Sequence, residues 1–330
     1  MNIRNRRAIH KTTGDILAAN SPTPYRIALW YTAVISVMSI LSAVLDGILS
    51  DRIAGTGGLG NIGLRSVLST AQTLFPIVQL IVTACLSLGF HQAILGITRG
   101  TGASPRTLLE GFRNFLPVLL ANLFQTLLYI SQAILSLYAA SSVFMMLPVS
   151  ASFYEVMEPL MDSASMMSSG LVVDDATLAA ATQTLKPLLW IWLGIFLLLF
   201  LPTYFGLRFT QFCIADNPRR GALAAMTKSR RMLRGNRIAL LKLDISMWWF
   251  YALQFLISVI LYGDSLLPLV GIWLPWSETF SYYFFFVLAM VAQVIAYYFL
   301  MSRVYVAYAL AYEGLQPTPP PESTPAMEEI

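Results

Sequence analysis

Six long apolar stretches, separated by short polar segments, dominate the sequence. They lie near 27–49, 67–97, 115–148, 187–215, 239–262 and 280–310. A helix needs about 20 mainly apolar residues to span the hydrocarbon core of a bilayer, and each stretch is long enough. The runs are continuous and do not alternate with polar positions, which favours helices over a transmembrane barrel. The pattern predicts an all-α polytopic membrane protein with six transmembrane helices, in a membrane domain that covers 27–312.

Polar segments flank this membrane domain at both ends. Residues 1–26 form a basic, amphipathic segment, and we expect it to be cytoplasmic. The first apolar stretch ends without a cleavage pattern and is typical of a signal anchor that stays in the protein. The last residues, 313–330, are rich in proline ("QPTPPPESTPAMEEI"), and a packed core cannot form from such a composition. They predict a disordered cytoplasmic tail.

The composition agrees with a membrane protein. Hydrophobic residues make up 57% of the chain and charged residues 12%, and the mean hydropathy is +0.66. Such values lie above those of a water-soluble domain. The two cysteines, Cys85 and Cys213, lie inside apolar runs and cannot form a disulfide framework or a multi-cysteine metal site.

The basic residues predict the orientation of the chain. Lys and Arg are concentrated in the N-terminal segment and in the second and fourth connections, whereas the outer connections carry only Arg52, Arg65 and Lys186. Loops rich in Lys and Arg stay on the cytoplasmic side. We therefore expect a multi-pass protein of the cell membrane with both termini in the cytoplasm.

A second expectation concerns the fourth connection, where 219–237 has one apolar and one basic face at 100° per residue. We expect one helix in the membrane interface, with its apolar face toward acyl chains and its basic face toward anionic head groups. The alternatives are that the charges only fix the topology, or that they bind phosphate or a protein partner; nucleic acid is not expected, because no binding fold is recognisable. The candidate lipid-surface residues are Arg220, Arg230, Arg231, Arg234 and Arg237.

Polar side chains inside the apolar stretches form a second set of candidates, because they are costly to expose to lipid. They predict hydrogen bonds between helices, with a transport pathway as the alternative. The residues are Gln79, His91, Asn122, Gln125, Gln211 and Gln293.

A basic segment followed by two apolar stretches occurs three times, starting near residues 2, 104 and 218. The first and third copies share a detail at equal spacing: Ala8, Leu17 and Asn20 match Ala224, Leu233 and Asn236. This predicts a parallel repeat of three two-span units, about an axis along the membrane normal.

The fourth connection and the fifth stretch also carry a family resemblance. "ADNP" at 215–218, Gly235-Asn236 and "DIS" at 244–246 followed by Trp248 resemble the core pattern of the DUF-nine-seven-five family (domain of unknown function) of bacterial integral membrane proteins. The N-terminal helix and the middle connection are similar to those of this family as well. The resemblance implies the topology and a bacterial cell membrane, and it brings no activity and no catalytic residues.

The sequence contains no pattern of catalytic, cofactor or metal chemistry. The phosphate-binding loop, the paired-histidine zinc motif and the nucleophile elbow are all missing, and the two histidines have no ligand-spaced partner. We therefore expect a non-enzymatic scaffold or accessory subunit of the cell envelope, in contact with anionic lipid, a protein partner or a second copy of itself. A small transporter or lipid translocator is the alternative, and an intramembrane enzyme is a third class.

Overall fold

The structure is a computed structural model that describes residues 5–55, 62–148, 150–151, 153, 175–263 and 278–316. Within its helices, the side chains of residues 46, 48–55, 62–65, 175–182, 184, 220 and 278–279 are not described. The glycine-rich turn at 56–61 and most of the outer loop at 149–186 therefore lie outside the described residues. So do residues 317–330 of the expected tail.

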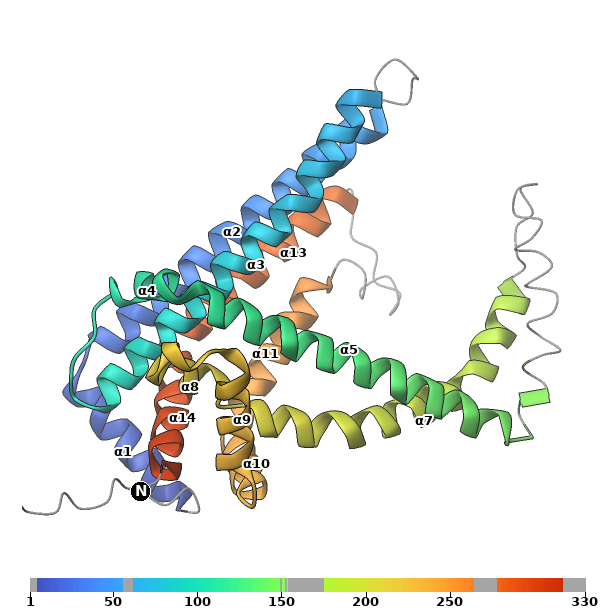
Figure 1. Cartoon of the computed structure of the whole chain (residues 1–330). Helices are drawn as coiled ribbons and strands as arrows, with labels where there is room; N and C mark the ends of the chain where they lie inside the picture. The colour runs from blue at the N-terminus through green and yellow to red at the C-terminus, as the bar shows by residue number, and fades with distance from the viewer. Residues whose placement is uncertain are drawn as a thin grey trace, which may run out of the picture. The chain divides into compact units, whose positions relative to one another are not determined.

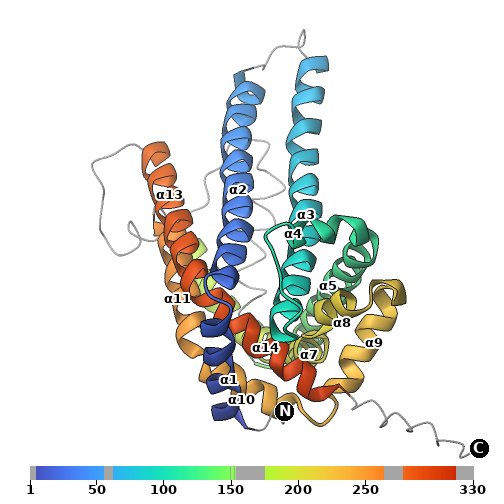
Figure 2. The same ribbon diagram turned by 90° about the vertical axis from the view of Figure 1, so that its left-hand side faces the viewer.

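The described chain is helical throughout (Figures 1 and 2). Five helical stretches of the described chain are long and apolar enough to cross a membrane, and there are six if a bent pair of helices counts as one span. The prediction of an all-α fold compatible with a polytopic membrane protein is confirmed. The main helices are α1 (Arg6–Ala19), α2 (Thr23–Gly55), α3 (Ile62–Thr98), α4 (Thr107–Glu110), α5 (Phe115–Met145), α7 (Asp175–Leu207), α8 (Thr210–Asp216), α9 (Ala222–Leu233), α10 (Arg237–Ser246), α11 (Trp248–Leu261), α13 (Glu278–Ala296) and α14 (Ser302–Leu315).

The chain divides into two compact units. Unit 1 contains residues 1–122 and 208–330, and unit 2 contains Leu123–Leu207. Within unit 1, the side-chain amide of Gln211 donates a hydrogen bond to Asn122 Oδ1 at 2.8 Å. This bond joins the two places where the chain leaves unit 1 and returns to it.

Most of the buried side chains of unit 1 lie at one end of it. We call this end the helical cap; it consists of α1, the last two turns of α3, α4, α8, α9, α10 and α14. Phe90, Leu233 and Tyr312 are completely buried there. In both views the cap lies opposite the end where α2 finishes and α3 begins (Figures 1 and 2). The long apolar helices, in contrast, leave many large apolar side chains exposed, as expected of helices that face lipid.

Two glycines allow α3 to approach the segment that follows it. A Cβ atom on Gly111 would overlap the backbone carbonyl of Cys85, and one on Gly89 would overlap that of Leu108. Any larger residue at either position would force the backbones apart. Gly111 begins a short 3₁₀ helix (Gly111–Asn114) that leads from α4 into α5.

The fifth apolar stretch does not form the straight helix expected over 239–262. It is divided at Met247 into α10 and α11, whose axes differ by 65°. The two halves pack on different partners. Met247 and Leu243 are buried in the cap, whereas Ile257 of α11 packs against Ala289 of α13. One straight helix cannot meet both requirements, so the chain bends between them.

The sixth apolar stretch extends further than expected. A π-helical turn, Tyr297–Met301, joins α13 to α14, and α14 continues to Leu315 in the cap. The expected start of the tail at residue 313 is therefore wrong, because Glu313 still belongs to this helix. Its neighbour Tyr312 is fully buried, which fixes the last turn of α14.

In unit 2, polar groups and aromatic rings join α5 and α7. The side chain of Gln132 donates a hydrogen bond to Thr203 at 2.6 Å, and Trp192 donates to the carbonyl of Ala133 at 3.4 Å. The rings of Tyr129 and Phe200 lie 5.1 Å apart.

Candidate functional site

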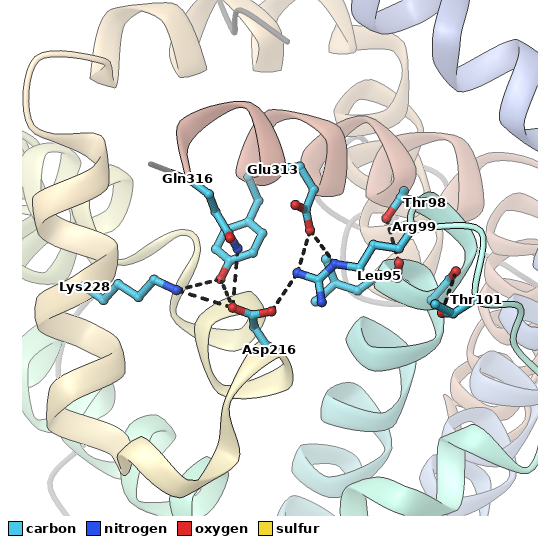
Figure 3. Close-up of polar contacts among 10 residues, drawn as sticks. Leu95, Thr98, Arg99, Thr101, Asp216, Lys228, Glu313 and Gln316 are labelled. Carbon is cyan, nitrogen blue, oxygen red and sulfur yellow. Dashed lines mark hydrogen bonds and ion pairs between the residues drawn. The ribbon is translucent and has the colours of Figure 1, made fainter. Parts of the chain in front are cut away.

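The cap contains a network of charged side chains centred on Asp216, the last residue of α8 (Figure 3). One carboxylate oxygen accepts a short bond of 2.6 Å from Arg99, directly after α3. The other lies 3.4 Å from Lys228 Nζ of α9 and accepts hydrogen bonds from Tyr312 and Gln316 at the end of α14. The network therefore ties four segments of the cap together.

A second carboxylate completes the network. Glu313 accepts a bond of 2.8 Å from Arg99 Nε, so this guanidinium bridges two acids. Burial disfavours the charge on Arg99, but the bonds to Asp216 and Glu313 outweigh it and raise the pKa of Arg99. Two cations and two anions meet here, and the network needs no further ion to balance its charge.

A polar cluster lies between the cap and the apolar helices of unit 1. Arg208 donates to the hydroxyl groups of Tyr251 and Tyr308 at 3.0 and 2.9 Å, and the Tyr308 hydroxyl donates to the buried carboxylate of Asp244. Next to it is a cavity of about 230 Å³, lined by the aromatic rings of Phe212, Phe250, Tyr305 and Tyr308 and by Ser87, His91, Arg208, Gln211 and Val304.

His10 joins α1 to α10. Its Nε2 lies 2.9 Å from the hydroxyl oxygen of Ser246. Burial lowers the pKa of His10, and the positive charges of Arg303 and Arg6 lower it further. The folded chain therefore favours the neutral imidazole.

The expected interfacial helix over 219–237 is wrong in two respects. The segment is interrupted at Gly221 and Gly235, whose φ angles of 75° and 86° suit glycine and end the helical run. Moreover, Ala225, Met226 and Leu233 of α9 are buried against protein. The apolar face of α9 is covered by the cap and is not available to acyl chains.

The predicted basic residues keep an exposed position. Arg230, Arg231, Arg234 and Arg237 are all exposed, at the end of α9 and the start of α10, while the side chain of Arg220 lies outside the described residues. A basic face therefore exists, but it belongs to the surface of a packed cap.

An apolar stripe that the sequence analysis missed lies on α10. Ile238, Leu241 and Ile245 follow one another at intervals of three or four residues and therefore share one face. Ile238 is 69% exposed and Ile245 58%. Trp248, which is 67% exposed, is the first residue of α11, beyond the bend at Met247. The opposite face, with Leu240 and Leu243, is buried in the cap. Helix α10 thus has two apolar faces, and within the part of the chain that the structure describes only one of them is buried.

The predicted intramembrane polar residues do not gather at one place. Gln79 donates to Ser39 Oγ at 3.1 Å, and Gln211 pairs with Asn122. His91 Nδ1 lies 2.6 Å from the carbonyl of Ser87 and lines the 230 Å³ cavity with Gln211.

The two remaining candidates, Gln125 and Gln293, are half-buried. Hydrogen bonds between helices are thus observed for Gln79 and Gln211. The side chains of Arg99, Asp216 and Arg208, which the sequence analysis did not select as sites, make more polar contacts than the selected ones.

No family model, curated protein or solved structure matches this chain.

Proposed function

We propose that this chain is a non-enzymatic multi-pass protein of the cell membrane that holds its helical cap against the inner leaflet, with α10 lying in the surface of an anionic bilayer. The single observation that carries the proposal is the exposed apolar stripe of α10. An exposed stripe of large apolar side chains is unfavourable in water, and these side chains are not buried in the cap.

The charges beside the stripe support this assignment. Arg237 and Lys242 are exposed, and at 100° per residue they fall on either side of the stripe. An apolar face with basic residues along its edges is typical of helices in the plane of a membrane surface, where long basic side chains reach the head groups. Each basic residue near an anionic surface contributes about 1 kcal/mol to binding.

The angle between α10 and α11 supports the same placement. If α11 crosses the bilayer close to its normal, the 65° bend directs α10 largely along the surface. Interfacial placement also avoids the cost of moving Lys242 into hydrocarbon. The exposed arginines of the cap favour the cytoplasmic side, because loops rich in Lys and Arg stay on that side.

Two further proposals follow from the sequence. The family resemblance given above would place the protein in a bacterial cell membrane. The repeat would make α1 and α9 equivalent helices, and two features support it. Asn20 and Asn236 each donate a side-chain hydrogen bond to the carbonyl four residues earlier, and the matching Leu17 and Leu233 are both buried.

The placement of α10 is tested with the full-length protein in lipid nanodiscs. A bimane fluorophore is attached to Ile245→Cys and, as a matched control, to Arg231→Cys on α9; the native cysteines, Cys85 and Cys213, are buried. Nitroxide-labelled lipids should quench the label at 245, and aqueous iodide the label at 231. If iodide quenches position 245 as strongly as position 231, the proposal is wrong.

The role of anionic lipid needs its own comparison. In nanodiscs with increasing phosphatidylglycerol, lipid quenching at position 245 should increase, and Arg237→Gln with Lys242→Gln should remove that increase. Arg113→Gln, an exposed arginine away from α10, serves as the control for net charge. If Arg113→Gln reduced lipid quenching at position 245 as much as Arg237→Gln with Lys242→Gln, the effect would come from net charge and not from the charges on α10.

A further inference from the structure

A cavity of about 350 Å³ lies between the apolar helices of unit 1, away from the cap. Ser39 and Ser42 of α2 and Gln72 and Gln79 of α3 contribute polar side chains to it. On each helix the two residues share one face, because they are three and seven positions apart. Gln79 donates a hydrogen bond to Ser39 Oγ at 3.1 Å, so two of the four polar side chains already bind each other at the cavity.

The wall of the cavity combines these polar groups with aromatic surface. Phe75 of α3 and Phe286 of α13 line it, together with Ala43, Leu45 and Pro76. Pro76 lies inside α3 and has no N–H, so one hydrogen bond of the helix is missing beside the cavity. The volume is within the range of small-molecule sites.

The cavity is partly open, and its opening borders apolar surface. Pro76 is exposed, and the residues next to it, Ile77 and Val78, are about half exposed. In a helix that crosses a membrane, such surface faces acyl chains. A molecule dissolved in the bilayer can therefore reach the cavity sideways.

The lining determines the chemistry of the occupant. None of the described side chains that line the cavity is ionisable. A carboxylate or phosphate group would lose its hydration without gaining an opposite charge from them, which is strongly unfavourable. Amide and hydroxyl side chains both donate and accept hydrogen bonds, and they match a ligand hydroxyl group, which does the same.

We propose that this cavity is a binding site for a neutral amphiphile that carries a hydroxyl group, such as the glycerol end of a diacylglycerol. The hydroxyl and ester oxygens lie among Ser39, Ser42, Gln72 and Gln79, and the apolar chains leave through the side opening. The site is independent of α10 and of the lipid surface at the cap. It supports a lipid carrier or translocator as a second function of the same chain.

The site is tested by photo-crosslinking of the full-length protein in nanodiscs. The probe is a diacylglycerol with a diazirine close to its glycerol group, and the comparison is phosphatidic acid with the same chains and diazirine. The diacylglycerol probe should label peptides of α2 and α3 saturably, and an excess of unlabelled diacylglycerol should compete. Labelling that does not saturate, or equal labelling by phosphatidic acid, would mean ordinary boundary lipid and would overturn the proposal.

Two variants connect the labelling to the cavity. Gln79→Leu keeps the size of the side chain and removes its hydrogen bonds, so the apparent affinity should fall about fivefold to tenfold. Ala43→Phe should fill the cavity and abolish saturable labelling, whereas Ala43→Ser leaves the space and should retain it. Ser131→Ala, an exposed serine of unit 2, is the control and should change nothing.

The folding of each variant is checked by its thermal unfolding midpoint in the same nanodiscs. If Gln79→Leu is folded and binds the probe as the wild type does, the polar lining does not recognise the ligand and the proposal is wrong.

Discussion

Replacing Asp216 by asparagine tests whether the charged network holds the cap together. Asp216→Asn keeps the shape of the side chain and removes its charge, which leaves Arg99 with Glu313 alone and Lys228 without an acid. Hydrogen bonds to charged groups contribute about 1.5–3 kcal/mol when buried, and exposed ion pairs about 0–1 kcal/mol. The side chain of Asp216 is 20% exposed and that of Arg99 37%. We therefore expect Asp216→Asn to reduce the stability of the cap by about 1–2 kcal/mol, a value between these limits.

The assay uses a cysteine that the chain already contains. Cys213 is buried and lies one turn before Asp216 in α8, so a maleimide reaches it only when α8 opens. Each 1.4 kcal/mol corresponds to a factor of about ten in the opening equilibrium. The variant should therefore react about 5 to 30 times faster than the wild type under conditions where opening is a rapid equilibrium.

Glu313→Gln is the matched control for this measurement. It removes a carboxylate that is 32% exposed and whose one charged partner among the described residues is Arg99. The loss of stability should stay below about 1 kcal/mol, which corresponds to an increase of less than about fivefold in the rate of the maleimide reaction. A rate for Asp216→Asn equal to that of the wild type, or no faster than that of Glu313→Gln, would refute the idea that Asp216 is the centre of the network.

Three other outcomes can be measured by thermal unfolding in detergent. Leu233→Ala, in the buried face of α9, should lower the stability by about 2–5 kcal/mol, whereas exposed Leu223→Ala should change it by less than about 0.5 kcal/mol. Gly111→Ala should be strongly destabilising because its Cβ meets the α3 backbone, and Gly14→Ala, with open space around it, should be neutral or slightly stabilising. The lowered pKa of His10 predicts that its contribution to stability is complete above its ordinary pKa of 6.5 and is lost as the pH falls through the lowered value. His10→Gln should remove this part of the pH dependence of stability. A variant whose stability changes with pH as that of the wild type does would contradict the prediction.

The hydropathy pattern was sufficient to predict the long helices, because each apolar stretch is nearly free of charge and exceeds the length of a span. It could not predict the bend at Met247. That position has neither proline nor glycine, and the bend follows from the different partners of α10 and α11. The sequence showed the two faces of α9 correctly, but an apolar face looks the same whether lipid or protein covers it.

The charged network shows a different limit of sequence reasoning. Arg99, Asp216 and Glu313 are separated by about one hundred residues from one to the next, and each looked like an ordinary charge at the end of a helix. Only the folding of α3, α8 and α14 into one cap brings them together. The available signals were their position just beyond apolar stretches and, for Asp216, its place in "ADNP" at 215–218, and neither signal specifies pairs.

The hydrogen bond between Asn122 and Gln211 lies where the chain leaves unit 1 and where it returns to it. Unit 2 begins and ends at two points that this bond holds side by side, as an inserted domain does. If both of its long apolar helices cross the membrane, its removal would leave the following segments on the same side. A shortened chain, in which a brief linker replaces residues 123–207, would retain the cap, the α10 surface and the 350 Å³ cavity, since all of their residues belong to unit 1.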